Sequence, residues 1–148
     1  MPNLLNLKTA ARTDLEDISR FLNENGLPTA GVEKAVENFV LAIDNHAAWI
    51  GTAGFELYGE SCLLRSVAVA IDYRGKGYGK SLVDAALRNA KARGARTAFL
   101  LTETASEYFK RLGFQVIDRK DIDEKVMTSQ EFTESCCETA TAMRKVLP

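Results

Sequence analysis

Apolar residues recur at helical spacing in two long stretches of the chain. In residues 13–23 one helical face is apolar, and Thr13 or Asp14 can cap that helix; the face carries Leu15, Ile18, Phe21 and Leu22. A second stripe follows the glycine-rich residues 74–79 and ends near Gly94; it consists of Leu82, Val83, Ala86, Leu87 and Ala90. The same pattern predicts shorter helices near residues 32–36 and over residues 105–112.

Between and after these helices the pattern is typical of strands. The predicted strands are residues 4–9, 39–43, 48–58, 62–70, 97–101, 114–117 and 139–146. Short turns between the second, third and fourth of them favour antiparallel pairing, and the strand-helix-strand run that follows is a crossover. Residues 119–137 are polar and carry no clear pattern. The sequence therefore predicts one α/β (α+β) domain over residues 1–148, with a mixed sheet flanked by helices.

Composition narrows the class of protein. A formal net charge of −1 over 148 residues gives no sign of a nucleic-acid partner. No apolar run approaches the roughly 18 residues of a membrane span, and the first residues lack the apolar core of a signal peptide. The three cysteines and the one histidine, His46, have no zinc-like spacing, so we expect reduced thiols, no metal and a cytoplasmic location.

The glycine-rich loop carries the clearest chemistry. Its residues, 73–81, read Tyr-Arg-Gly-Lys-Gly-Tyr-Gly-Lys-Ser and lie between an apolar strand and an amphipathic helix. Glycines let backbone N–H groups approach a ligand, and a helix start adds unpaired donors that favour phosphate. A Walker P-loop would need glycine at Arg74, and a Rossmann fingerprint would need it at Lys80 or Leu82. A glycine-rich turn without any ligand is the other interpretation.

At this loop the sequence resembles the GNAT superfamily of acetyl-CoA-dependent N-acetyltransferases. The superfamily motif Gln/Arg-x-x-Gly-x-Gly/Ala is matched by Arg74, Gly77 and Gly79. The segments on either side also match in kind and order: Leu64-Arg65-Ser66-Val67-Ala68-Val69 before the loop and Tyr108-Phe109-Lys110-Arg111-Leu112-Gly113-Phe114 after it. The resemblance implies a mostly antiparallel sheet whose strand 62–70 splays from strand 97–101. It also adds the expectation of a homodimer, because dimers are common in this kind of fold.

The same resemblance implies where acetyl-CoA binds. The cofactor's pantetheine would pair with the backbone of the strand residues Val67, Ala68 and Val69, and one amide would polarise the thioester carbonyl. The loop would hold the pyrophosphate through the amides of Arg74, Gly75, Lys76, Gly77, Tyr78, Gly79 and Lys80. An acceptor amine would then attack the thioester directly, with stabilisation of the oxyanion.

The chain departs from the family at one catalytic position. Many members carry a tyrosine as general acid where this chain has Phe109, which has no proton to give. Tyr108 is one position earlier, about 100° round the helix. It is our candidate for the acid, with packing or solvent exposure as the other interpretation.

Two charged residues are candidates on the acceptor side. Glu103 follows the strand 97–101 and is the best-placed general base, although it could instead interact with the dipole of the next helix; Glu56 is a weaker rival. Arg65 shares parity with Val67 and Val69, so we expect all three side chains on one face of the sheet. Its guanidinium could clamp a substrate carboxylate or pair with a structural acid.

The predicted function is transfer of an acetyl group from acetyl-CoA to the amine of a small molecule, which would be amino-acid-like if Arg65 is a clamp. A non-catalytic acyl-CoA-binding or sensor domain and a protein acetyltransferase are the alternatives. The tail, with Phe132, Cys136 and Cys137, has a fainter resemblance to a GNAT subgroup associated with arsenic-resistance operons. A thiol pair could bind arsenite, although adjacent cysteines are usually small apolar residues at a strand entry.

Overall fold

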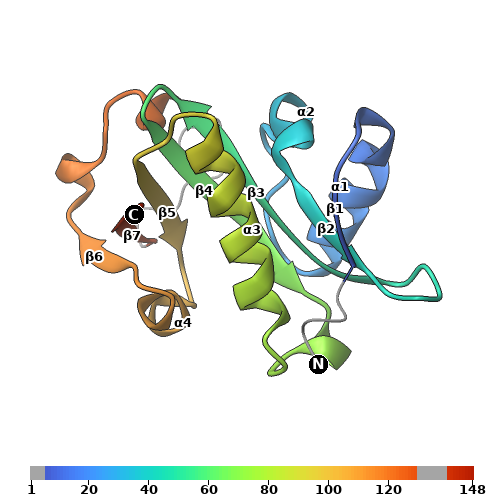
Figure 1. Cartoon of the computed structure of the whole chain (residues 1–148). Coiled ribbons are helices and arrows are strands. Elements are labelled where there is room, and N and C mark those ends of the chain that lie inside the picture. Colours follow the sequence, from blue (N-terminus) through green and yellow to red (C-terminus); the bar gives the residue numbers. More distant parts are fainter. Residues whose placement is uncertain (1–5, 130–139) are drawn as a thin grey trace.

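The computed structural model describes residues 6–129 and 140–148. Its strands form one sheet in the order β1-β2-β3-β4-β5-β7-β6 (Figure 1). The strands are β1 (Asn6–Thr9), β2 (Val40–Ile43), β3 (Trp49–Tyr58), β4 (Ser61–Val69), β5 (Thr97–Thr102), β6 (Gln115–Ile117) and β7 (Thr141–Val146). The helices are α1 (Leu15–Glu24), α2 (Val32–Ala35), α3 (Tyr78–Ala92) and α4 (Ser106–Arg111).

Strand pairing confirms the predicted fold class. Neighbouring strands are antiparallel except for β4 and β5, which run parallel because α3 returns the chain to the same end of the sheet. The helices predicted at 13–23 and after residue 79 are α1 and α3. The strand predicted at 4–9 is described from Asn6 onward, and the one predicted at 139–146 from Thr141 onward.

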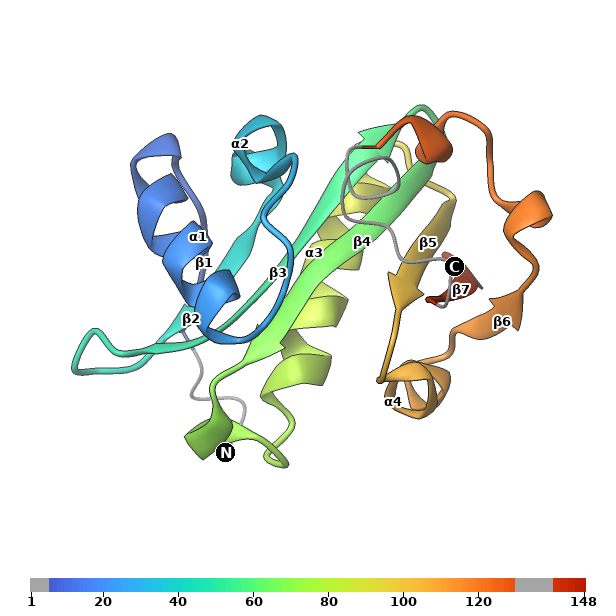
Figure 2. The same cartoon turned by 180° about the vertical axis from the view of Figure 1, so that it is seen from behind.

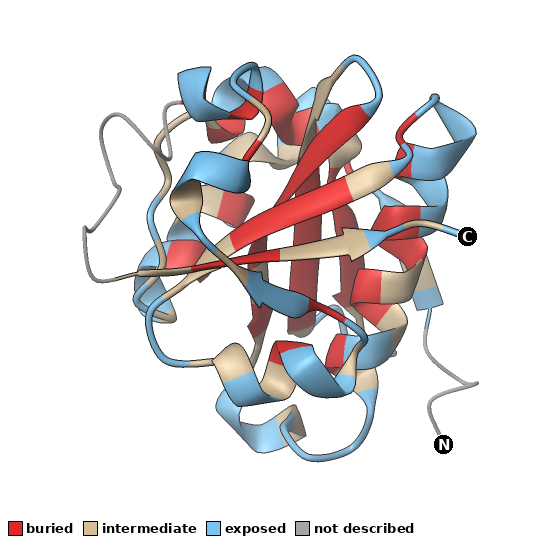
Figure 3. Cartoon of the chain, turned by 90° about the vertical axis from the view of Figure 1, so that its left-hand side faces the viewer, coloured by how far each residue is buried: buried red, intermediate tan, exposed pale blue. Residues whose placement is uncertain are grey.

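Helices cover both faces of the sheet (Figures 1 and 2). The apolar stripe of α3 packs on one face, against residues such as Phe55, Leu64 and Leu100. On the other face α1 and α2 pack against Phe39, Leu41 and Ala68. Figure 3 shows that the buried residues gather in the inner strands, whereas β6 at the sheet edge is exposed. The ends of β4 and β5 are the region where the strands of the sheet separate, as the pairing of these two strands shows.

Residues 118–129, which carry no clear pattern in the sequence, form a cover for part of the sheet. Two 3-10 turns, Arg119–Asp121 and Val126–Thr128, lie on either side of the buried Ile122. Ile122 and Val126 pack against Leu63 of β4 and Phe99 of β5. Single apolar residues in a polar stretch are a weak signal, and for this reason no element could be predicted here.

Strands β4 and β5 pair over a short distance only. Their register is Ser61 with Thr97, Cys62 with Ala98 and Leu63 with Phe99. Beyond Leu63, among the residues that the structure describes, strand β4 is paired only with β3. Strand β5 continues to Thr102 paired with β7 on its other side. The two central strands therefore splay, as the family resemblance implied.

A β-bulge interrupts β4 just beyond the point of divergence. Ser66 and Val67 together oppose the single residue Ala53 of β3, because the register runs from Gly54–Arg65 to Thr52–Ala68. Ser66 adopts a left-handed backbone conformation, with φ of 58°. Its carbonyl accepts a hydrogen bond of 2.8 Å from the hydroxyl of Thr52, which holds the bulge in place.

The bulge makes the expected parity of Arg65 wrong. Val67 and Val69 pack on the α3 side of the sheet with Leu64. Arg65 lies on the opposite face, where it binds Glu56 and the carbonyl oxygen of Pro28. The extra residue in β4 reverses the alternation of side chains between Arg65 and Val67, since side-chain direction in a strand changes at every residue.

Candidate active site

A cavity of about 1060 Å³ opens where β4 and β5 diverge. Its walls come from five parts of the chain that are distant in sequence. They are the turn after α1 (Asn25, Gly26, Leu27, Pro28), the second half of β4, the glycine loop with the start of α3, the end of β5 with residues 103–105 and α4, and Ala140 before β7. The cavity is large enough for a cofactor with part of a second molecule.

One end of the cavity is the N-terminus of α3. Gly77 is the N-cap residue with φ of 89°, and no side chain among the described residues caps this helix. The first intrahelical bond runs from the Ser81 amide to the Gly77 carbonyl, 3.2 Å, so the amides of Tyr78, Gly79 and Lys80 precede it. The first turn carries no acidic residue. Three amides and the positive end of a 15-residue helix thus point at one place, which is an arrangement suited to a phosphate group.

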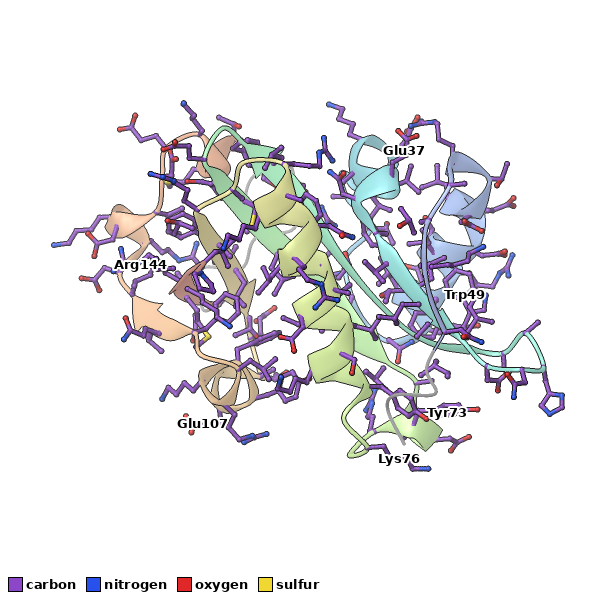
Figure 4. The ribbon with its side chains drawn as sticks, viewed as in Figure 1. Glu37, Trp49, Tyr73, Lys76, Glu107 and Arg144 are labelled. Carbon is purple, nitrogen blue, oxygen red and sulfur yellow. The ribbon has the colours of Figure 1, made fainter. Side chains whose placement is uncertain are left out.

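Basic side chains surround this end. Lys80 pairs with Asp84 at 2.8 Å, and Lys76 lies over the ring of Tyr73, 5.9 Å from its centroid. Figure 4 shows Tyr73 and Lys76 together at the loop between β4 and α3, whereas Glu107 points away from the sheet. The positive potential is therefore concentrated on the loop that the motif identifies.

Arg74 ties the loop to the cavity wall. Its Nε donates to the carbonyl oxygen of Val69 at 2.8 Å, and one terminal nitrogen donates to Asn25 at 3.3 Å. Of the backbone groups of Val69, which the resemblance implied for pantetheine, the carbonyl is thus already bonded within the chain. Val67 and Ala68 line the cavity beside it, as expected from the strand position.

Tyr108 lies in the cavity wall, and Phe109 packs in the core. The Tyr108 ring is half-buried, and its hydroxyl reaches Gly79 so closely that a Cβ on Gly79 would collide with it. Burial raises the pKa of Tyr108, so the hydroxyl keeps its proton at neutral pH. Phe109 is 8% exposed and stacks edge-on against Phe114, with the ring centroids 5.9 Å apart. The Tyr108 hydroxyl thus projects from α4 toward the first turn of α3.

Glu103 lies at the rim of the cavity. It is exposed, directly after β5, and lines the opening together with Thr102 and Thr104. The Thr102 hydroxyl accepts a hydrogen bond of 3.0 Å from the Ala105 amide, which holds the turn into α4. Glu103 is therefore on a defined turn at the mouth of the site.

Arg65 is part of a buried polar network behind the cavity. Its guanidinium bonds Glu56 at 2.7 Å, and the side chains are 0% and 11% exposed. Glu56 also accepts a hydrogen bond from the Tyr58 hydroxyl. Burial, together with the bond to Glu56, raises the pKa of Tyr58 to about 12. Of the two interpretations of Arg65, pairing with an acid is therefore observed, while Arg65 also lines the cavity.

The sequence analysis did not assign three parts of this site. They are the turn at residues 25–28, Tyr73 beyond its place at the start of the loop, and Ser66. A polar residue within an otherwise apolar strand is the signal that could have identified Ser66. It lines the cavity and is 8% exposed.

Other candidate chemistry is limited. Cys136 and Cys137 lie outside the described residues, so the arsenite hypothesis stays a prediction. Burial raises the pKa of the Cys62 thiol to about 12, which makes it unreactive. Within residues 6–129 and 140–148, no group of three or more His, Cys, Asp or Glu side chains could hold a metal ion. In the same part of the chain, no helix combines the length and the apolar character needed to cross a membrane.

Comparison with known proteins assigns the fold to one family. Residues 35–116, more than half of the chain, match the acetyltransferase (GNAT) domain. An uncharacterized N-acetyltransferase of Chlorobaculum tepidum is 28% identical over 127 residues, covering 81% of this chain and 81% of that protein. The amino-acid acetyltransferase of Pasteurella multocida is 27% identical over 116 residues, or 75% of this chain. The matched region is only 26% of that larger protein.

Solved structures have the same fold. N-acetylglutamate synthase from Neisseria gonorrhoeae, complexed with coenzyme A and N-acetyl-glutamate, superposes with a TM-score of 0.81 at 20% identity over 97% of this chain, which corresponds to 35% of the synthase chain. Rv2747 from Mycobacterium tuberculosis, in complex with CoA and NLQ, gives a TM-score of 0.79 at 22% identity and covers 97% of this chain and 99% of that one. With the matched domain, the splayed central strands and the glycine motif at the start of α3, the chain belongs to the GNAT family of acetyltransferases.

Proposed function

We propose that this domain transfers the acetyl group of acetyl-CoA to the amine of a small molecule of the amino-acid type. The observation that carries the proposal is the cavity between β4 and β5, which has an uncapped helix N-terminus at one end and a separate polar wall at the other. Two relatives are named amino-acid acetyltransferases, and one structural neighbour is complexed with N-acetyl-glutamate, which supports this class of acceptor.

Acetyl-CoA would enter with its pyrophosphate on the amides at the start of α3. The loop from Arg74 to Lys80 would surround the phosphates, with Gly75, Lys76 and Gly77 in the turn and Tyr78 and Gly79 in the first helical turn. Pantetheine would follow the unpaired edge of β4 along Val67, Ala68 and Val69. Since β4 has no paired strand on that side beyond Leu63 within the described part of the chain, we expect its backbone to be available to a ligand in an extended conformation.

The acceptor would approach from the other side of the sheet. There the cavity is lined by Pro28, Ser66 and Arg65, and we propose that Arg65 contacts the acceptor. Glu103 at the rim is our candidate for the base that takes the proton of the amine. Tyr108 is our candidate for the group that protonates the departing thiolate, since burial keeps its hydroxyl protonated at neutral pH.

The first experiment measures cofactor binding by titration calorimetry and thermal unfolding with acetyl-CoA and CoA, and with ATP and NAD as controls. We expect stabilisation by acetyl-CoA and CoA only, because a ligand that binds the native state raises the melting temperature. Gly77→Ala should weaken binding at least about tenfold, since a side chain at this helix N-cap obstructs the phosphate. Gly94→Ala is the matched control: its φ of 105° imposes the same backbone strain, and it does not line the cavity. Equal affinity of the two variants would contradict the placement.

The second experiment identifies the acceptor. Release of CoA thiol is followed with α-amino acids, aliphatic amines and peptides, and the products are identified by mass spectrometry. We expect turnover with an α-amino acid. Turnover with peptides alone would favour a protein acetyltransferase, and binding of acetyl-CoA without turnover would favour the acyl-CoA-binding alternative. In variants, Glu103→Gln should lower the rate most at low pH, where the amine is protonated, and Tyr108→Phe should lower kcat.

We further propose a cytoplasmic location, which the odd number of cysteines without metal spacing supports. A homodimer is the assembly that we expect, and sedimentation equilibrium tests it. A monomer at micromolar concentration would contradict that expectation.

A further inference from the structure

Ser66 has a backbone conformation that its residue type does not favour. It lies inside a central strand with φ of 58°, in the left-handed region where glycine has the lowest energy. Among the described residues the other non-glycine residue with positive φ is Ala47, which lies in the exposed turn between β2 and β3. A turn imposes such a conformation commonly, whereas a strand does so only at a bulge. A serine here keeps a strained backbone that a glycine would relieve, which directs attention to its side chain.

The hydrogen bonding of Ser66 fixes the direction of its hydroxyl. Nε of Arg65 lies 3.1 Å from Oγ of Ser66, and a guanidinium N–H can only donate, so Oγ is the acceptor. Arg65 is itself held by Glu56 at 2.7 Å. Within the part of the chain that the structure describes, no group accepts the Ser66 hydroxyl hydrogen. The hydroxyl is therefore a donor whose oxygen is already polarised by a cation.

Ser66 is also close to where the chemistry would occur. It follows the last β4–β5 pair, Leu63 with Phe99, by three residues and directly precedes Val67. It lines the cavity and is 8% exposed, so a hydrogen bond from it would form in a largely dehydrated place. Of the other hydroxyls that line the cavity, that of Tyr108 reaches Gly79 at the helix end, and that of Thr102 accepts the Ala105 amide at the mouth.

We propose that the Ser66 hydroxyl donates a hydrogen bond to the negative charge that develops on the thioester during acetyl transfer. This rests on the proposed function. The amine nitrogen bonds to the carbonyl carbon and the C–O π pair moves to oxygen; the C–S bond then breaks and its electron pair goes to sulfur. The amine proton leaves to the base, and the thiolate takes a proton from the acid. Ser66 keeps its own proton throughout and stabilises the charge by its dipole.

The decisive variant is Ser66→Gly, because glycine suits the backbone at this bulge. We expect its melting temperature to equal or exceed that of the wild type. Its kcat with acetyl-CoA and the α-amino acid found in the acceptor screen should fall about 10- to 100-fold. The KM for acetyl-CoA should stay unchanged. Ser66→Ala should lose the same activity with a lower melting temperature. Because stability changes in opposite directions in the two variants, an activity loss common to both cannot arise from the fold. Ala47→Gly relieves the same kind of strain in a turn outside the cavity and should leave kcat unchanged.

Two outcomes would overturn the role of Ser66 alone. Wild-type turnover in Ser66→Gly would do so, and so would a raised KM for the amino acid with kcat unchanged, which would assign the hydroxyl to binding of the acceptor. If the wild type binds acetyl-CoA and acetylates no amine, the proposed function fails first and the role of Ser66 falls with it. The wild-type assay therefore distinguishes the two failures.

Discussion

The hydroxyl of Tyr73 donates a hydrogen bond of 2.7 Å to Oδ2 of Asp44, which joins the turn between β2 and β3 to the start of the glycine loop. The other carboxylate oxygen of Asp44 accepts the amides of His46 at 2.8 Å and Ala48 at 2.9 Å. Asp44 is thus fixed by its own turn before it binds Tyr73. The Tyr73 ring contacts Tyr78 edge-on, with 5.7 Å between centroids, so this bond also orients the first residue of α3.

Loss of the Tyr73–Asp44 hydrogen bond should weaken binding of acetyl-CoA, although the bond itself is not a contact with the cofactor. We expect Tyr73→Phe to raise the Kd for acetyl-CoA about three- to tenfold, which is the usual effect of one net hydrogen bond. Calorimetric titration measures it. Asp44→Ala should give a similar Kd, and the double variant should add little, because both changes remove one bond. Independent, additive effects would show that the bond does not position the loop.

The same bond predicts a pH dependence of stability. The hydrogen bonds from Tyr73, Ala48 and His46 hold the pKa of Asp44 below its ordinary value of 3.8. A carboxyl with a lowered pKa in the folded state stabilises the fold above its ordinary pKa, and that stabilisation is lost as the pH falls through the lowered value. We therefore expect the melting temperatures of the wild type and Asp44→Asn to differ at pH 7 and to converge at the acid end of a titration. A constant difference would contradict this.

The buried pair of Arg65 and Glu56 should be costly to break. Glu56→Gln removes the carboxylate that pairs with the buried guanidinium at 2.7 Å, and we expect a loss of about 3 kcal/mol in the free energy of unfolding. Urea denaturation measures this loss. Replacing both residues, as in Arg65→Met with Glu56→Leu, should recover much of it. If the loss of unfolding free energy in the double variant equals the sum of the losses in the two single variants, the ion pair is not the cause of the loss.

Tyr58 reports on the same network at alkaline pH. Its pKa of about 12 lies above the ordinary value of 10, so the folded state holds the proton more tightly than the unfolded state does. Stability from this group is complete below pH 10 and is lost as the pH rises toward 12. In Glu56→Gln we expect the Tyr58 pKa to fall, since the hydrogen bond to a carboxylate is one cause of the shift. Ultraviolet titration of the phenolate, with Tyr58→Phe as the reference, measures it.

Gly54 shows how closely the sheet is packed on the face that α1 and α2 cover. A Cβ at this position would lie 2.5 to 2.7 Å from three ring atoms of Phe39. We expect Gly54→Ala to lower the free energy of unfolding by about 2 kcal/mol through overpacking. In a Phe39→Leu background the same change should be less costly, and denaturation of the four proteins of this cycle tests the coupling. Additive costs would mean that Phe39 is not the obstacle.

The sequence could predict what depends on local pattern. The stripe from Leu82 to Ala90 and the glycines before it identified α3 and the glycine-rich turn at its start, because helix period and turn residues are local properties. The splay of β4 and β5 was predicted from the family resemblance, since the sequence pattern of an apolar strand is the same whether or not a neighbouring strand is present. The face of Arg65 was predicted wrongly because the alternation rule assumes a regular strand, and one residue with positive φ at Ser66 reverses it. The Arg65–Glu56–Tyr58 network spans two strands, and no pattern along one strand encodes it.

The divergence of β4 and β5 has a consequence for how the domain exists in solution. Beyond Leu63 one edge of a central strand has no paired strand among residues 6–129 and 140–148, and an extended pantetheine chain would there complete the sheet as a strand made of cofactor. The ligand-free domain should then be the less cooperative form, with its backbone amides from Leu64 to Val69 exchanging hydrogen faster than those of β3. Its resistance to proteolysis would follow the cellular supply of acetyl-CoA, so the cofactor would act as a structural part of the fold as well as a reactant.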